Sequence, residues 1–506
     1  FNEFNALFQR NRLGLQASGI VGENATYGDD IVFSGLQGRY SFSLGLFNYK
    51  TDGFRDNNDF KHNVANIFSQ VRLSPKTSIQ GEYRYSDNER GDLELTSTGS
   101  FIPTLRQGED VKSIRLGLHH AFTPKNDLIA SVMYQYGGLN LEMTQGPMAL
   151  DLSSNCDHYI GEIEFLHKSS WLHLTGGFSH RHLDGELNEI MVITPPVPFL
   201  PPTTTTRFEK SEVKFTSAYL YSQFNFFNNF SFHLGLSADS LDETDDTQDV
   251  SLINPKLGIT YQPVPSTTIR AAVFKTLQRP FFSRLNIDPS IEPTQVAGFN
   301  QFFFGARGDH GWRYGLALDH KFPKYVYTGV EVSKRDLVAR FIDRSGPTPS
   351  LVERNWDEYI GRAYFYLTPH PWVALTAEYL YEYFKRDVSG GFAGTSEFET
   401  LKTHRLPLGI KFFHPCGVSA GLTATSIDQK GGFVVFSGPT FSIVQGQDSF
   451  WMVDASIGYR LPKRHGLITF EVKNLFDEQF SFQDTDPGNP RILPGRVVLL
   501  RATFSF

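Results

Sequence analysis

Several features that mark large protein classes are rare or absent in this sequence. Only 2 of its 506 residues are cysteines, Cys156 and Cys416, and they form no CxxC or zinc-binding spacing, which excludes a disulfide-stapled scaffold. No run of 18 apolar residues occurs, which excludes a transmembrane helix. The 47 basic and 54 acidic residues leave a net charge of -7, which argues against nucleic-acid binding. Since 40% of the residues are hydrophobic and 14% aromatic, disorder is also excluded.

Apolar and polar residues alternate with a period of two along most of the chain. Within residues 77–85, Ile79, Tyr83 and Tyr85 fall on one face, and Glu82 and Arg84 fall on the other. This period is that of a β-strand with two different surroundings. Alternation also occurs in soluble sandwiches, so the connections between strands must distinguish the two.

The junctions between these strands alternate in length. Every second one is short and rich in Pro, Asn or Gly, as at 75–77, 123–126 and 228–229, and such residues favour tight hairpins. The intervening junctions are long and polar, including 185–212 and 278–310. Short turns on one rim and long loops on the other are typical of an outer-membrane barrel. The sequence therefore predicts an all-β fold, a transmembrane antiparallel β-barrel with short periplasmic turns and long extracellular loops.

The number of strands is predicted to be about 22, from a first strand near 8–19 to a last strand at 495–506. Residues 1–506 are interpreted as a single outer-membrane β-barrel domain. The Pro/Thr tract 194–206 is interpreted as an extracellular loop. Cys156 is expected near the extracellular rim and Cys416 in a periplasmic turn, too far apart for a disulfide.

A membrane barrel places apolar side chains toward lipid and leaves polar ones for an aqueous lumen. The candidate lumen-lining residues are the charged members of the alternating strands. They are Glu82, Arg84, Arg115, Glu162, Glu164, Asp319, Glu331 and Arg501.

The last 40 residues carry a recognisable pattern. The run 472–477 contains Asn474, Leu475, Phe476 and Asp477, and it is followed by Pro494, Gly495 and Arg496 ahead of a final strand that ends at Phe506. A terminal Phe preceded by alternating apolar residues resembles the signal by which barrels are recognised for insertion. Together these residues resemble the C-terminal box of TonB-dependent outer-membrane receptors.

The resemblance implies a 22-stranded transport barrel in the outer membrane of a Gram-negative bacterium. It also implies membrane lipid, the barrel-insertion machinery and the TonB system as partners. Receptors of this family carry a plug domain that fills the lumen. Here the first strand is expected almost at once, so no plug is expected within this chain, and the lumen would need another gate.

Two other functions stay open on the sequence alone. The opening residues, including 42–56, resemble receptor-like barrels that follow a periplasmic tetratricopeptide scaffold, which suggests a plugless, porin-like channel or anchor for export of polymer or protein. The long loops would also suit a surface interaction protein. An upstream plug would favour import, whereas upstream helical repeats would favour export.

Other chemical candidates are weaker. The acidic run 242–249 lacks the spaced ligands of a calcium loop and is interpreted as a solvated loop. His180 and His182 share a strand face, but no carboxylate completes a metal set by sequence, so they are interpreted as wall residues. The aromatic run 299–305 is interpreted mainly as structural, with ligand contact as the alternative. No local Ser–His pairing with a third orienting group is found, so neither an enzyme nor a cofactor is expected.

Overall fold

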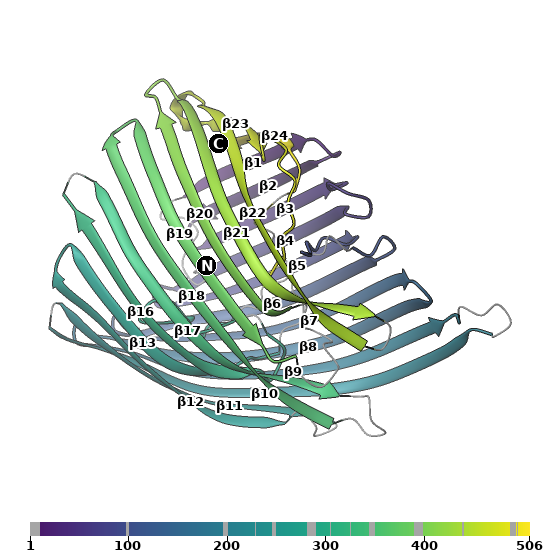
Figure 1. The fold of residues 1–506 in the computed structure, drawn as a ribbon. Coiled ribbons are helices and arrows are strands. Elements are labelled where there is room, and N and C mark those ends of the chain that lie inside the picture. Colours follow the sequence, from purple (N-terminus) through teal and green to yellow (C-terminus); the bar gives the residue numbers. More distant parts are fainter. Residues whose placement is uncertain are drawn as a thin grey trace.

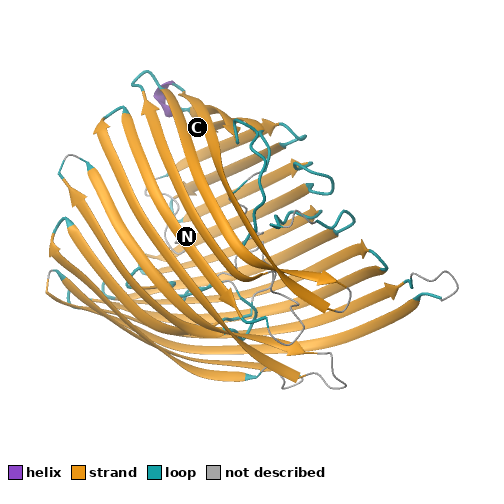
Figure 2. Cartoon of the chain, viewed as in Figure 1, coloured by secondary structure: helices purple, strands orange, loops and turns teal. Residues whose placement is uncertain are grey.

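A computed structural model shows the chain as a closed barrel of antiparallel strands (Figure 1). It describes residues 11–97, 101–195, 201–227, 229–244, 249–280, 290–303, 305–323, 325–343, 350–388, 398–437, 440–485, 492 and 494–506. Within these residues, no helix is long and apolar enough to cross a membrane. The helical content described is one short 3-10 turn, η1 (Pro462–Arg464), and the rest is strand and loop (Figure 2).

Twenty-two strands form the barrel wall, as the sequence predicted. The first half consists of β1 (Arg12–Gly22), β2 (Tyr27–Gln37), β3 (Tyr40–Thr51), β4 (Phe60–Ser74), β5 (Thr77–Arg90), β6 (Arg106–Thr123), β7 (Asn126–Gln145), β8 (Met148–Lys168), β9 (Leu172–Ile193), β10 (Thr203–Phe227) and β11 (Phe230–Glu243). The second half consists of β12 (Val250–Val264), β13 (Thr267–Leu277), β16 (His310–Phe322), β17 (Val326–Asp343), β18 (Ser350–His370), β19 (Val373–Arg386), β20 (Phe398–Phe413), β21 (Val418–Ser437), β22 (Thr440–Arg460), β23 (Gly466–Lys473) and β24 (Val497–Ser505). A separate two-stranded sheet, β14 (Gln295–Val296) and β15 (Phe299–Asn300), lies between β13 and β16.

Each strand pairs with its sequence neighbour, and the first strand closes the barrel against the last. β1 pairs with β24 from Gln16 opposite Ser505 to Gly22 opposite Leu499, and the Ser18 hydroxyl donates to Thr503 Oγ1 at 3.1 Å. Closure satisfies the edge N–H and C=O groups that hydrocarbon would otherwise leave unpaired.

The two faces of the wall are chemically opposite. On β8, Ile163 and Phe165 are 45% and 38% exposed and point outward, whereas Glu162 and Glu164 between them are buried on the inner face. In a water-soluble protein this arrangement would be inverted, and in a membrane barrel the exposed apolar band contacts lipid. The buried apolar clusters accordingly lie inside the barrel, where loops pack against the wall.

Short turns lie on the periplasmic rim as predicted, with three corrections to the lengths of connections and strands. The extracellular connection between β7 and β8 consists of only residues 146–147, so not every extracellular junction is long. The connection 185–212 is mostly strand, because β9 and β10 stay paired up to Ile193 and Thr203. Residues 203–206 of the Pro/Thr tract therefore belong to β10, while 196–200 lie outside the described residues. The first strand begins at Arg12 and ends at Gly22, three residues beyond its predicted end. Long strands here replace long loops because antiparallel pairing continues above the membrane.

Candidate functional site

All eight charged residues selected from the sequence lie on the inner face of the wall, as judged from their exposed outward neighbours. Next to Glu82 and Arg84 on β5, for example, Tyr83 is 40% exposed on the outer face. The same holds for Arg501 on β24, where Leu500 is 44% exposed outward. Their role in lining a transport path remains a prediction.

These residues do not form one cluster but several separate networks. Arg270 on β13 forms ion pairs with Asp319 at 3.2 Å and Glu331 at 3.3 Å, and the Tyr364 hydroxyl donates to Asp319 at 2.7 Å. Across the barrel, Arg115 forms an ion pair with Glu82 at 2.5 Å. The Arg115 pair links adjacent strands, whereas the Arg270 network extends over the four consecutive strands β13, β16, β17 and β18. The charged side chains of both networks remain partly exposed to the lumen.

The connection between β13 and β16 folds into the barrel rather than away from it. We call residues 290–303 the infolded segment. Phe299 is 1% exposed and packs with Val296 and Ala297 against Phe274 and the neighbouring alanines of the inner wall. Because β14 and β15 form a small hairpin of their own, the segment enters the lumen with its backbone paired locally.

Polar contacts attach the start of the infolded segment to β8. Glu162 accepts hydrogen bonds from the Ser290 hydroxyl at 2.9 Å and from the Ile291 N–H at 3.0 Å. It also lies 3.6 Å from the guanidinium of Arg181 on β9, which is fully buried. One lumen-lining candidate therefore anchors a loop that is 128 residues away in sequence.

A second set of contacts centres on Glu292. The Tyr221 hydroxyl donates to Glu292 at 2.6 Å, and Gln301 Nε2 donates to the same hydroxyl at 2.9 Å. Burial raises the pKa of the Glu292 carboxyl, while Arg279, 3.8 Å away, acts in the opposite direction. Sequence reasoning missed these residues, because an inward-folded loop has the same polar composition as an outward one.

The aromatic run 299–305 has a structural role in the described residues. Phe299 fills the wall contact, and Phe302 and Phe303 lie under the guanidinium groups of Arg279 and Arg335 at 3.9 and 5.0 Å. Such cation–π contacts restrain the arginines as well as the rings.

The connection between β23 and β24 also folds inward. Phe480 stacks on Phe450 of β22 at 4.1 Å between ring centroids, and the Asp484 N–H donates to the Leu95 carbonyl at 2.9 Å. Gln483 exchanges hydrogen bonds with Gln429 of β21 and accepts one from the Ser97 N–H. Leu95 and Ser97 belong to the connection between β5 and β6. This connection and the one between β23 and β24 therefore meet inside the lumen.

The C-terminal box residues shape this connection and the barrel seam. Asn474 is 1% exposed with φ 47°. Its Nδ2 donates a hydrogen bond to the Glu478 carbonyl, and its Oδ1 accepts one from the Glu478 N–H. Asp477 accepts from the Arg496 N–H at 2.8 Å, beside Gly495 with φ 83°. Leu475 donates its N–H to Val453, Phe476 is 71% exposed and Pro494 is half-buried.

Phe506 lies at the periplasmic end of the seam. Its N–H and C=O both bond to Leu15 of β1, at 2.9 and 3.1 Å.

The weaker candidates divide. His182 lies close to two carboxylates, Asp184 on its own strand and Glu212 on β10, and the second is a cross-strand neighbour that the sequence alone does not reveal. Half of the acidic run 242–249, residues 245–248, lies outside the described residues.

Two further sequence features concern a motif at the periplasmic rim and the two cysteines, of which Cys156 lies within β8 and Cys416 in the turn between β20 and β21. A Gly-x-Ser-x-Gly match exists at 417–421, but it enters strand β21 rather than a helix and so forms no nucleophile elbow. Cys156 and Cys416 are both free.

Comparison with known proteins identifies the class. The family model "TonB dependent receptor-like, beta-barrel" matches residues 8–315, so the chain belongs to this family of outer-membrane proteins of Gram-negative bacteria. This match does not include the C-terminal box. The family consists of transporters rather than enzymes, and the membership does not favour the export or surface-adhesion alternatives.

Solved structures share the fold at low sequence identity. The ferripyoverdine receptor of Pseudomonas aeruginosa is 14% identical with a TM-score of 0.73, covering 98% of this chain and 72% of that chain. The copper transporter OprC is 13% identical with a TM-score of 0.74, covering 99% and 81%. The ferric citrate transporter FecA is 13% identical with a TM-score of 0.71, covering 99% and 79%. No curated protein sequence matches the chain.

Proposed function

We propose that this barrel imports a substrate across the outer membrane and that the infolded segment is a constriction that must leave the wall for passage. The observation that carries the proposal is the packing of residues 290–303 inside the lumen, with Phe299 buried against the wall and Glu162 bound to Ser290. The segment is attached to the extracellular ends of β13 and β16, so a ligand arriving from outside reaches it first. Membership in the family makes TonB the expected source of energy.

The cargo we infer is a metal or an anionic metal chelate. The structural neighbours include a ferripyoverdine receptor, a ferric citrate transporter and a copper transporter. In this chain, Arg279, Arg335 and Arg55 each lie over an aromatic ring, with side chains 13–17% exposed and ion-paired with Glu292, Glu358 and Asp92. A flat anionic chelate would replace these carboxylates as the partner of guanidinium groups that are held over aromatic faces.

A reversible tether tests the constriction. An ideal Cβ at Gly258 lies 2.8 Å from Ala297 Cβ, and a disulfide needs roughly 3.5–4.5 Å. A small outward shift of the segment therefore allows Gly258→Cys with Ala297→Cys to join β12 to it, after both native cysteines are replaced by serine. The tether is placed in a Phe299→Ala background, which removes the main wall contact. We expect high ion current in planar bilayers when the tether is reduced and low current when it is oxidised.

The single-cysteine variants serve as controls and should not respond to oxidation. Equal current in the oxidised and reduced double variant would contradict the proposed constriction. The cargo is tested separately, by titrating ferric citrate into the refolded barrel. Saturable binding weakened by Arg335→Gln supports an anionic chelate, and no binding of any ferric chelate or copper would reject this cargo class.

A further inference from the structure

The outer face of the barrel changes character at one level of β8, β9 and β10. Along β9 the outward residues run from Leu174 and Phe178 to His182 and Asp184, while the alternate residues, such as Arg181, are buried inside. Strands rise about 3.3 Å per residue and cross the hydrocarbon in roughly 9–11 residues, so His182, ten residues beyond the start of β9, lies at the upper edge of the apolar band.

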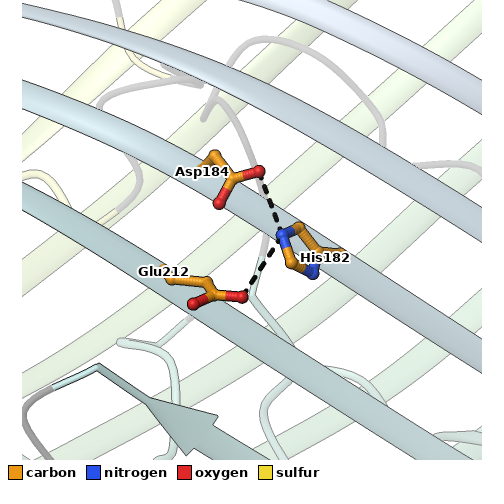
Figure 3. Close-up of side chains that lie close together, drawn as sticks. All are labelled: His182, Asp184 and Glu212. Atoms are coloured by element: carbon orange, nitrogen blue, oxygen red, sulfur yellow. Dashed lines mark hydrogen bonds and ion pairs between the residues drawn. The ribbon is translucent and has the colours of Figure 1, made fainter.

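Three metal-binding side chains gather at this edge (Figure 3). Asp184 lies directly opposite Glu212 in the pairing of β9 with β10, and His182 is two residues before Asp184 on the same face. His182 Nε2 is 3.0 Å from Asp184 Oδ2 and 3.6 Å from Glu212 Oε1. All three donor atoms lie within 4.8 Å of one another.

These distances fit a shared ion. Metal–ligand bonds of about 2.0–2.2 Å place neighbouring donors roughly 3.0–3.5 Å apart in tetrahedral or octahedral geometry. Two of the three pairs already have this spacing or are within 0.1 Å of it, so closing the third needs only a small rotation of an exposed carboxylate. The strands hold the three Cα atoms rigidly, and the Tyr159 ring contacts the His182 ring edge-on at 6.3 Å between centroids, which orients the imidazole.

Two carboxylates directly opposite each other in a sheet repel, so a cation between them stabilises the pair. Lys214 supplies one at present, with Nζ 2.6 Å from Glu212 Oε1. Lys214 is ion-paired with Glu212 and interacts with Asp184 only at longer range. A doubly charged ion between all three donors would neutralise both carboxylates at once and would displace Lys214.

We propose that His182, Asp184 and Glu212 bind a divalent transition metal ion on the outer surface of the barrel. One imidazole and two carboxylates suit Zn²⁺ better than Mg²⁺ or Ca²⁺, which prefer oxygen ligands. Asp184 and Glu212 are 53% and 42% exposed in their side chains, so the ion keeps open positions toward solvent and lipid headgroups. The site is outside the lumen and does not depend on the proposed cargo.

The test is a calorimetric titration of ZnCl₂ into the refolded full chain in detergent. We expect one saturable site whose affinity falls about tenfold or more in His182→Ala and in the conservative variant Asp184→Asn. Glu186→Gln removes the next outward acid of the same strand, which pairs with Lys210, and should leave the affinity unchanged. Lys214→Met should raise the affinity, since it removes the competing ammonium group.

The Lys214 variant separates a metal site from an ordinary ion-pair network, which would gain nothing from losing a lysine. Absence of a saturable Zn²⁺ site in the wild-type protein would overturn the proposal. Binding that is unaffected by both His182→Ala and Asp184→Asn would also overturn it, because the ion would then be held elsewhere. The heat-dependent gel shift of a folded barrel verifies that each variant has folded.

Discussion

The inner wall of the barrel is covered on one side and open on the other. On β10, Val213, Phe215 and Ser217 point inward and are at most 4% exposed, and the first two pack in a buried apolar cluster with side chains of neighbouring strands. On β1, none of the eleven residues is buried, and inward-facing Gln16 is exposed. Both strands follow the same two-residue alternation, so strand pattern alone does not set burial. The difference comes from the connections that fold back into the lumen.

The largest expected effect comes from removing a charge on the covered side. Arg181→Met leaves Glu162 without its cation on the buried wall, and such a loss costs about 3–5 kcal/mol. Arg106→Met breaks the exposed pair with Asp59 on the open side and should cost less than about 1 kcal/mol. Guanidinium unfolding of the detergent-refolded barrel measures both. Equal costs would show that the covered wall is no less solvated than the open one.

Carboxyl groups on the two sides should also contribute to the stability of the barrel with opposite dependence on pH. Burial raises the pKa of Asp309, on the covered side, to about 7, so its stabilising contribution is complete below about pH 4 and is lost as the pH rises to about 7. The size is about 4 kcal/mol at most. The hydrogen bond from Arg106 lowers the pKa of Asp59, so its contribution is present above pH 4 and is lost as the pH falls.

Unfolding free energies measured from pH 3 to 8 test these two signs. Asp309→Asn should reduce the fall in unfolding free energy between pH 4 and 7. Asp59→Asn should reduce the fall in unfolding free energy that occurs as the pH drops below 4. An unchanged pH profile in Asp309→Asn would mean that this carboxyl is already ionised at pH 5 in the folded barrel.

A smaller and more local effect is expected for Phe299→Ala. Loss of the ring leaves a cavity between the segment and β13, which should cost about 3 kcal/mol of stability. Amide exchange in 291–303 should therefore be about a hundredfold faster, while the amides of the strands stay protected. Hydrogen-exchange mass spectrometry resolves this difference. Phe476→Ala, at a position 71% exposed, is the control and should change little. Uniform acceleration over the whole barrel would argue against a separable segment.

The smallest effect compares two amide side chains. Asn254 on β12 is fully buried and donates to Asp239 at 2.5 Å, so Asn254→Ala leaves a buried acceptor and should cost about 1–3 kcal/mol. Gln16→Ala on the open side should stay within about 0.5 kcal/mol. The same unfolding titration measures both, and similar values would remove the distinction between the two walls.

The alternation of apolar and polar residues, together with the turn-forming residues between strands, was enough to predict the barrel from the sequence. The strand count, the short periplasmic turns and the inward side of residues such as Glu82, Glu162 and Arg501 all follow from a period of two applied between hairpins. These are local properties, because each residue's face depends on its neighbours in the same strand. Strand ends were less certain, as at 185–212, because pairing above the membrane depends on the partner strand.

Tertiary structure alone decided what lies inside the barrel and what gathers on its surface. Glu162 meets Ser290 across 128 positions, and the long polar loop that carries Ser290 gives no local signal of its inward direction. Asp184 and Glu212 are 28 positions apart and become neighbours only through the register of β9 with β10. Sequence periodicity specifies which face a side chain takes, but contacts between distant strands and loops depend on pairing register and on the closure of the whole barrel.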